Sequence, residues 1–153
     1  MLGNIAVAAR FAQRQHGIER VLIVDYDVHH GNGTEAMFYD DPSVLFISTH
    51  QYPLYPGTGA VTDTGSGRGA GYTINIPMPG GCGDHNYAAV FEQVVWRAAE
   101  RFAPELILVS AGFDAHWTDL LAGMSLTLTG YAHLTRELMR MADQFWWVER
   151  SSL

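Results

Sequence analysis

The sequence predicts an α/β protein, a three-layer α/β/α sandwich on a mainly parallel sheet. Short apolar runs typical of buried strands alternate with longer segments of helical periodicity. The 153 residues, 48% of them hydrophobic, provide enough chain for the core of one domain. Helices between strands imply right-handed crossovers, and these produce a parallel sheet covered on both faces. We therefore expect one domain over residues 1–153.

The first half of the chain predicts one helix and three strands. Residues 5–12 have a helical pattern that ends near Gly17, a glycine suited to the C-terminal cap. The run Val21–Val24 is β-branched and apolar, which favours a buried strand. Two similar runs predict strands over residues 44–48 and 72–76.

The second half predicts helix, strand and helix. Asp84 is placed to cap a helix whose apolar residues recur at helical spacing as far as Phe102. A second buried strand is expected over residues 105–110. The last helix is expected to begin near Thr129, with one apolar face formed by Tyr131, Leu134, Leu138, Met141 and Ala142.

Two segments follow apolar runs and end in residues that bind metals. Residues 25–33 leave the first strand, and residues 110–116 leave the run at 106–109. If the extended path continues to His29, the alternation of a strand projects Asp25, Asp27 and His29 to one side. Ligands of open α/β sheets collect outside the carboxyl ends of the strands, so the two segments are expected to meet there.

Asp27, His29 and Asp114 are the proposed metal ligands. Two carboxylates and one imidazole leave a coordination position open, which is the arrangement of a catalytic zinc site. Such an ion polarises a carbonyl group and lowers the pKa of its bound water from about 16 toward roughly 7, so hydrolysis is the expected reaction class. A strand-end loop with helix-capping carboxylates would explain residues 25–29 without a metal, but Asp114 in its matching context favours the metal.

Three motifs in the same order resemble those of the histone deacetylase and acetylpolyamine amidohydrolase family. They are Asp25-Tyr-Asp-Val-His-His-Gly-Asn-Gly-Thr34, Tyr55-Pro-Gly-Thr-Gly59 and Ser110-Ala-Gly-Phe-Asp-Ala-His116. The resemblance runs from about Leu2 to about Asp143, and Asn32 with the Phe-Asp-Ala-His wording resembles the class II and bacterial branch. It implies an arginase/deacetylase-like fold and zinc-dependent removal of acetyl groups from acetyl-lysine or acetylated small amines.

The resemblance also implies a role for each site residue. The zinc ligands of the family correspond to Asp27, His29 and Asp114. Asp25 corresponds to a carboxylate that orients the ligands and helps bind a structural potassium ion, together with Ser48 and main-chain carbonyls near Asp27, His29 and Thr49. Tyr55 corresponds to an aromatic wall of the acetyl-lysine channel, and Leu121 to an apolar residue at its mouth.

Two catalytic features of the family have no counterpart in this sequence. The family has a tandem His pair upstream of these motifs and a Tyr in a downstream Gly-Gly-Tyr loop. Here the only histidine before Asp25 is His16, and no Gly-Gly-Tyr follows Asp114. We therefore expect the central part of a deacetylase-like catalytic domain, incomplete at both ends. Loss of one transition-state donor costs roughly 100- to 1000-fold in rate, so this chain is expected to be a weak or inactive enzyme.

Other functions remain open. The chain is alternatively a non-catalytic metal-binding remnant or an interaction module of the same fold. A dimanganese ureohydrolase of the arginase type is disfavoured, because such sites use more bridging carboxylates than this loop offers. His30 is expected to hold its loop by hydrogen bonds, and His50 to be structural or solvent-facing.

Composition restricts the partners and the location. A net charge of −7 and a pI near 5.3 argue against a nucleic-acid binder and are compatible with cationic substrates. The single cysteine, Cys82, excludes an internal disulfide. The sequence has neither a long apolar run nor the basic region of a signal peptide, so we expect no membrane partner and a cytoplasmic location. Uncovered sheet edges would favour oligomers.

Overall fold

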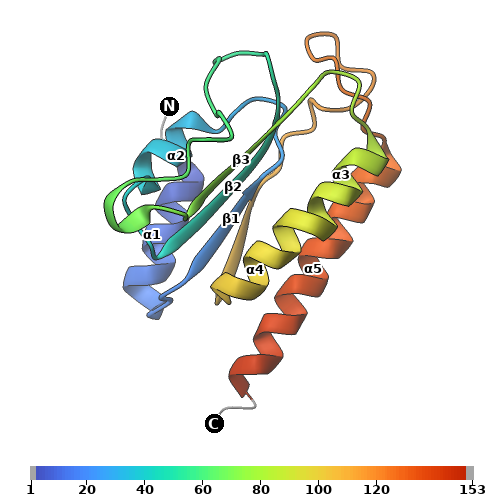
Figure 1. Ribbon diagram of the computed structural model, residues 1–153. Helices are drawn as coiled ribbons and strands as arrows, with labels where there is room; N and C mark the ends of the chain where they lie inside the picture. The colour runs from blue at the N-terminus through green and yellow to red at the C-terminus, as the bar shows by residue number, and fades with distance from the viewer. Residues whose placement is uncertain (1–2, 151–153) are drawn as a thin grey trace.

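A four-stranded parallel sheet forms the centre of the molecule (Figure 1). The computed structural model describes residues 3–150, with side chains through residue 145. The strand order is β3-β2-β1-β4, and every neighbouring pair is parallel. The strands are β1 (Val21–Asp25), β2 (Val44–Gln51), β3 (Thr73–Met78) and β4 (Leu106–Ser110).

Helices cover both faces of this sheet, so the three-layer sandwich expected from the sequence is confirmed (Figure 1). One face carries α1 (Asn4–His16) and α2 (Asn32–Phe38). The other carries α3 (Asp84–Val90), α4 (Trp96–Phe102) and α5 (Leu128–Arg150). A short 3-10 turn, η1 (Gly67–Gly69), precedes β3. No helix of the described residues has the length and apolar character needed to cross a membrane.

The alternation of β1 divides the core between the two faces. Val21 and Ile23 pack with the buried face of α1, whereas Leu22 and Val24 belong to the larger cluster under α3–α5. All four side chains are fully buried. Burial of each such side chain contributes about 1.5–3 kcal/mol, so the strand is held from both sides. Gly17 ends α1 in the left-handed conformation that the sequence predicted, with φ of 68°.

Several sequence-based expectations about individual elements are wrong. The strand β4 was expected to be buried, but it lies at the edge of the sheet and most of its residues are only partly buried. The helix α2 was not expected, because Asn32 and Gly33 have low helix propensity and the helix is short. A π-helical turn, η2 (Phe91–Val95), joins α3 to α4 within the single helix that periodicity predicted. Ala142, expected on the apolar face of α5, is exposed.

Asp84 does not cap α3 with its side chain. It is the first residue of that helix, and Gly83 occupies the N-cap position. Its two carboxylate oxygens instead accept hydrogen bonds from the backbone N–H and the hydroxyl of Thr127, at 2.8 and 2.6 Å. Because Thr127 immediately precedes α5, the carboxylate ties the starts of α3 and α5 together.

The order of the strands brings two loops to one place. Parallel pairing aligns Asp25, the last residue of β1, with Ser110, the last residue of β4. The loop after β1 and the loop after β4 therefore leave the sheet side by side at its carboxyl edge. These are the two segments that carry the candidate metal ligands.

Candidate metal centre

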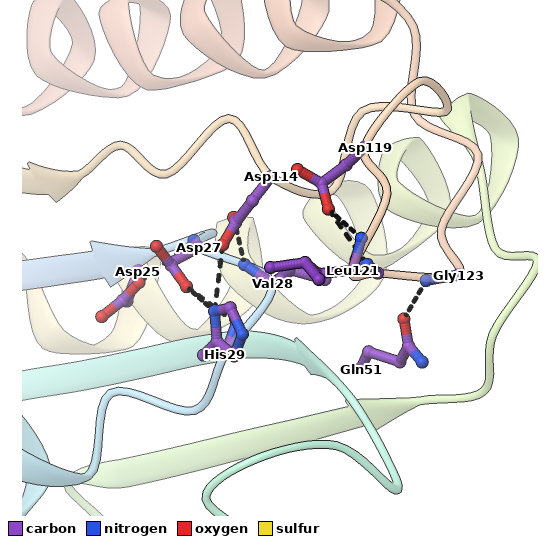
Figure 2. A network of polar contacts seen from close by, with 10 residues as sticks. Asp25, Asp27, Val28, His29, Gln51, Asp114, Asp119, Leu121 and Gly123 are labelled. Carbon is purple, nitrogen blue, oxygen red and sulfur yellow. Dashed lines mark hydrogen bonds and ion pairs between the residues drawn. The ribbon is translucent and has the colours of Figure 1, made fainter.

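Asp27, His29 and Asp114 lie together at the carboxyl edge of the sheet, as the sequence predicted (Figure 2). One ligand atom from each residue lies within 4.8 Å of the other two. His29 Nδ1 is 3.0 Å from Asp27 Oδ1 and 2.9 Å from Asp114 Oδ2. All three side chains are partly exposed, so an ion and a substrate can reach them from solvent.

A pair of side-chain-to-backbone hydrogen bonds folds the loop after β1. Asp25 Oδ1 accepts the N–H of Asp27 at 3.2 Å, and Asp27 Oδ1 accepts the N–H of His29 at 2.8 Å. Aspartate bonds of this kind, to the backbone two residues on, stabilise turns rather than strands. The expectation of an extended path to His29 is therefore wrong: β1 ends at Asp25, and the bends after it bring Asp27 and His29 to Asp114.

Two further contacts fix Asp114 against this loop. Asp114 Oδ1 accepts the N–H of Val28 at 2.9 Å, which leaves Oδ2 facing His29. Gly112 lies so close to the same loop that a Cβ there would be 2.6 Å from the Cα of Asp27. Only glycine allows the two loops to approach this closely.

The donor set fits a zinc ion. Tetrahedral zinc holds nitrogen and carboxylate ligands at about 2.0–2.2 Å, which places ligand atoms about 3.3 Å apart. The two separations from His29 Nδ1, 2.9 and 3.0 Å, are close to that spacing. A hollow of about 410 Å³ is lined by Asp27 and His29, together with Asp25 and Gly112, and leaves space for water or substrate. Two carboxylates and one imidazole are also a ligand set that catalytic zinc accepts.

Asp25 lies behind the three residues and is not one of the group. Its carboxyl is buried, and its pKa is raised to about 7, chiefly by burial and also by the negative charges of Asp27 and Asp114, which outweigh the lowering by hydrogen bonds from the Asp27 N–H and Ser110. In Figure 2 its carboxylate points away from His29. A cation held nearby would favour the ionised form of this carboxyl.

Ser48 and Thr49 lie beside Asp25 on the neighbouring strand. Ser48 is the register partner of Asp25, and the Thr49 hydroxyl donates to the Asp25 carbonyl at 3.4 Å. Both residues are fully buried. The Ser48 hydroxyl, however, is within hydrogen-bond distance of His50 Nδ1, at 3.0 Å.

The two residues expected to line a substrate channel lie on exposed loops. Tyr55 is 79% exposed, and its ring stands edge-on to His29 with the centroids 6.3 Å apart. Leu121 is 85% exposed and extends in the direction of the metal-ligand group in Figure 2. Its loop is held by hydrogen bonds from the Leu121 N–H to Asp119 and from the Gly123 N–H to Gln51, both at 2.8 Å.

Leu121 does not line the hollow of about 410 Å³ next to the candidate metal ligands Asp27 and His29. It lines a neighbouring hollow of about 690 Å³, together with Phe113, His116 and Tyr131. Sequence reasoning did not predict this second hollow, because it depends on how the loop after β4 folds over the start of α5.

Two buried tyrosine hydroxyls near the centre were also missed. The hydroxyls of Tyr87 and Tyr131 have no hydrogen-bond partner among the described residues. Burial raises the pKa of both phenols, and the negative charge of Asp114 adds to the rise. Nothing in the sequence distinguishes these residues from ordinary core tyrosines at helical spacing.

Comparison with known protein families identifies the family of this chain. Residues 1–148 match the histone deacetylase domain. The chain belongs to the histone deacetylase family. Its resemblance to that family, expected from the three motifs, is therefore confirmed over nearly the whole sequence.

Individual histone deacetylases are similar over most of the chain. Histone deacetylase 14, chloroplastic, of Arabidopsis thaliana is 50% identical over 144 residues, which cover 94% of this chain and 34% of that protein. A probable deacetylase of Archaeoglobus fulgidus is 46% identical over 94% of this chain and 40% of its own length. The solved structure of the histone deacetylase Clr3 matches with a TM-score of 0.88 and 48% identity, over 92% of this chain and 25% of that one. This chain thus spans between a third and two fifths of these two curated relatives.

Proposed function

We propose that this chain provides the zinc centre of a deacetylase that removes acetyl groups from acetyl-lysine or from acetylated small amines. The observation that carries the proposal is the convergence of Asp27, His29 and Asp114 at the carboxyl edge of a histone deacetylase fold. Zinc, when bound there, would polarise the acetyl carbonyl and lower the pKa of a water molecule.

The surrounding residues would hold the ligands in place. The N–H groups of Val28 and His29 bond to Asp114 Oδ1 and Asp27 Oδ1, so each carboxylate is restrained in orientation. Hydrogen-bonded groups behind a metal site orient its ligands and tune their basicity. Asp25 would act in this way through the Asp27 N–H, without touching zinc.

A structural potassium ion beside Asp25 is a further part of the proposal. Ser48 is the register partner of Asp25, the Thr49 hydroxyl lies 3.4 Å from the Asp25 carbonyl oxygen, and hard cations prefer oxygen ligands such as these. The carbonyls near Asp27 and His29 would supply the remaining ligands. A cation bound there would stabilise the ionised form of Asp25, whose pKa is raised chiefly by burial.

Tyr55 and Leu121 would contact the substrate. The edge-on contact of Tyr55 with His29 places an aromatic surface beside the metal-ligand group, where the apolar stem of an acyl-lysine side chain would pass. Leu121 would form part of the rim. The net charge of −7 suits a cationic substrate and disfavours nucleic acid.

A second candidate function is a metal-binding module without catalysis. It is favoured by the sequence, which contains neither an upstream tandem His pair nor a Gly-Gly-Tyr after Asp114. A general base and a transition-state donor each contribute roughly 100-fold or more. We therefore propose that residues 1–153, a single domain, hydrolyse acetyl-lysine slowly or not at all without further residues.

Zinc-dependent hydrolysis of an acetyl-lysine peptide by the purified chain tests both functions, with Asp114→Asn purified in parallel to reveal contaminating enzymes. Activity that requires zinc and disappears in the variant supports the deacetylase. Equal background signals, from a wild-type chain that nevertheless binds about one zinc ion, support the metal-binding module. A chain that binds no zinc contradicts both.

The expected location remains a prediction. The cytoplasmic location was inferred from composition, whereas the similar protein of Arabidopsis thaliana carries the word chloroplastic in its name. The bacterial branch suggested by the motifs is likewise a prediction, since plant and archaeal proteins are among the relatives. Fractionation of the source cells with an antibody to this chain would decide its location.

A further inference from the structure

Two buried histidines lie between the loop after β1 and the loop that carries Tyr55. His30 follows the proposed ligand His29, and His50 is near the end of β2. Their exposed fractions are 4% and 1%, and their ring centroids are 4.8 Å apart. We call residues 52–63, which connect β2 toward β3, the channel loop. The two rings form the surface on which this loop rests.

His50 binds the channel loop through the backbone. Its Nε2 lies 3.0 Å from the carbonyl oxygen of Gly59. Because a carbonyl oxygen only accepts, Nε2 carries the proton and donates. Nδ1 of the neutral ring is then an acceptor, and it accepts a hydrogen bond from the Ser48 hydroxyl at 3.0 Å. Burial lowers the pKa of His50 to about 4, so the ring is neutral at physiological pH and this pattern is fixed.

His30 binds the preceding residue of the channel loop. Its Nε2 lies 3.1 Å from Glu35 Oε2, a carboxylate oxygen that can only accept. Its other ring nitrogen, Nδ1, is within hydrogen-bond distance of the Thr58 hydroxyl, at 2.8 Å. Asn75 on β3 donates to the same Glu35 oxygen, so the acceptor is itself held in position.

Gly59 shows how closely the loop rests on the two rings. A Cβ at this position would lie 2.6 Å from His50 Nε2 and 2.7 Å from His30 Cγ. Its φ of +85° is also a conformation that residues with side chains rarely adopt. The backbone at Thr58 and Gly59 is therefore fixed by both contact and hydrogen bonding, whereas Tyr55 in the same loop is 79% exposed and has little contact of its own.

We propose that His30 and His50 are positioning residues for the substrate, because they hold Thr58 and Gly59 and thereby place Tyr55 beside His29. The inference rests on the proposed deacetylase function and deepens it. The Gly57 N–H bonds to the Leu54 carbonyl at 2.8 Å, so the turn that contains Tyr55 is continuous with the anchored residues. Loss of the anchor moves the aromatic wall relative to the zinc site but leaves the zinc ligands in place.

The test removes one hydroxyl from an exposed residue. Thr58→Val deletes the hydrogen bond to His30 without a change in size, and Thr58→Ser keeps it. Thr64→Val is the matched control, because Thr64 is exposed, lies outside the channel loop and makes no side-chain hydrogen bond within the described part of the chain. His50→Gln, which retains a donor near Gly59, compared with His50→Leu tests the second histidine.

Three measurements separate the possible roles. Zinc affinity is measured by competition with a chelating dye. Binding of a peptide with Nε-trifluoroacetyl-lysine to the zinc-loaded chain is followed by fluorine NMR. Amide exchange at Gly57 and Asp63 is followed in the metal-free chain, because both N–H groups make hydrogen bonds inside the channel loop.

Thr58→Val is expected to weaken peptide binding roughly three- to tenfold and to speed exchange by a similar factor, the usual effect of one hydrogen bond. Zinc affinity should stay within about twofold, and Thr58→Ser and Thr64→Val should resemble the wild type. Unchanged exchange and peptide binding would overturn the inference, as would an equal loss of zinc and peptide affinity. A wild-type chain that binds zinc but no peptide would refute the deacetylase function and the substrate role together, even where exchange shows that the loop is held.

Discussion

The Nδ1 atom of His29 lies 2.9 Å from Oδ2 of Asp114, although every element from α2 to β4 lies between the two residues in the sequence. The contact exists because β1 and β4 are parallel neighbours whose last residues, Asp25 and Ser110, are paired. Each strand delivers its loop to the same edge of the sheet. The candidate metal centre is therefore a direct consequence of strand order.

Asp114→Asn should weaken zinc binding by at least about 100-fold, because it replaces an anionic ligand by a neutral amide, and even changes behind a metal site cost 10- to 100-fold. Asp119→Asn is the matched control: it removes the same charge from a nearby loop residue that bonds only to Leu121 and Ala122. Competition with a chelating dye measures both affinities. Equal zinc affinities in the two variants would show that general negative charge, and not ligation, holds the ion.

Gly112→Ala should weaken zinc binding about tenfold or more, because the added Cβ would lie 2.6 Å from the Cα of Asp27 and push that ligand aside. Gly33→Ala makes the same substitution inside α2, where a Cβ would meet nothing within 4 Å. That control should bind zinc normally and gain roughly 0.5–1 kcal/mol in free energy of unfolding, since alanine favours a helix. The two zinc titrations and two urea melts check both statements. Normal zinc affinity in Gly112→Ala would mean that the loops separate without cost.

The strands could be predicted from local sequence patterns. The meeting of the two loops that carry the candidate metal ligands could be predicted from a general rule of sheet topology. Runs such as Val21–Val24 are too short and too β-branched for helices, and parallel strands present their carboxyl ends at one edge. Asp27 and Asp114 could therefore be placed together without any knowledge of their contacts.

What sequence reasoning missed depends on contacts between distant residues. Asp84 has the position of a helix cap, but its oxygens bond to Thr127, which no local pattern reveals. The bends after Asp25 arise from aspartate side chains that compete with the strand for backbone N–H groups. The burial of β4 was overestimated because an apolar run does not show whether its strand is central or at an edge.

Thr127→Val should lower the free energy of unfolding by about 1–2 kcal/mol, the usual cost of losing a side-chain cap. The Thr127 hydroxyl donates to Asp84 and accepts the N–H of Gly130 in the first turn of α5. Thr129→Val is the control, because Thr129 is exposed in the same turn and its hydroxyl has no partner within residues 3–150. Urea denaturation of both variants measures the difference. Equal free energies of unfolding in the two variants would show that water replaces the hydrogen bonds of the Thr127 hydroxyl at the start of α5.

Between about pH 7 and pH 4, His50 should make the metal-free chain less stable as the pH falls, whereas Asp25, whose folded pKa is raised to about 7, should act in the opposite direction. Burial, with the neighbouring His30, lowers the pKa of His50 to about 4 against the opposing hydrogen bonds to Gly59 and Ser48. An unfolded histidine titrates near pH 6.5. Between these pH values, His50 is protonated in the unfolded chain but not in the folded chain. The His50 contribution therefore favours unfolding at lower pH, by on the order of 1–3 kcal/mol between the two pKa values.

His50→Gln should remove the His50 contribution alone, so that, relative to the wild type, the variant becomes more stable as the pH falls from 6.5 to 4.5. His85→Gln replaces an exposed histidine of α3 and should run parallel to the wild type. The other titratable groups near His50, namely His30 and Glu35, are unchanged in both variants. Urea melts at several pH values give the slopes. A His50→Gln slope equal to that of the wild type would mean that the buried ring takes up its proton in the folded chain.

The outer edge of β4 should make the chain self-associate. Among residues 3–150, β4 pairs only with β1, so its other edge presents unpaired backbone groups beside apolar side chains such as Val109, which is 38% exposed. Val109→Lys should shift the chain toward monomer, because a charged side chain on an edge strand opposes pairing with a second copy. Val61→Lys adds the same charge to a loop residue that is 68% exposed and should leave association unchanged. Sedimentation velocity over a range of concentrations measures all three proteins, and a wild-type chain that remains monomeric throughout would refute an associating edge at β4.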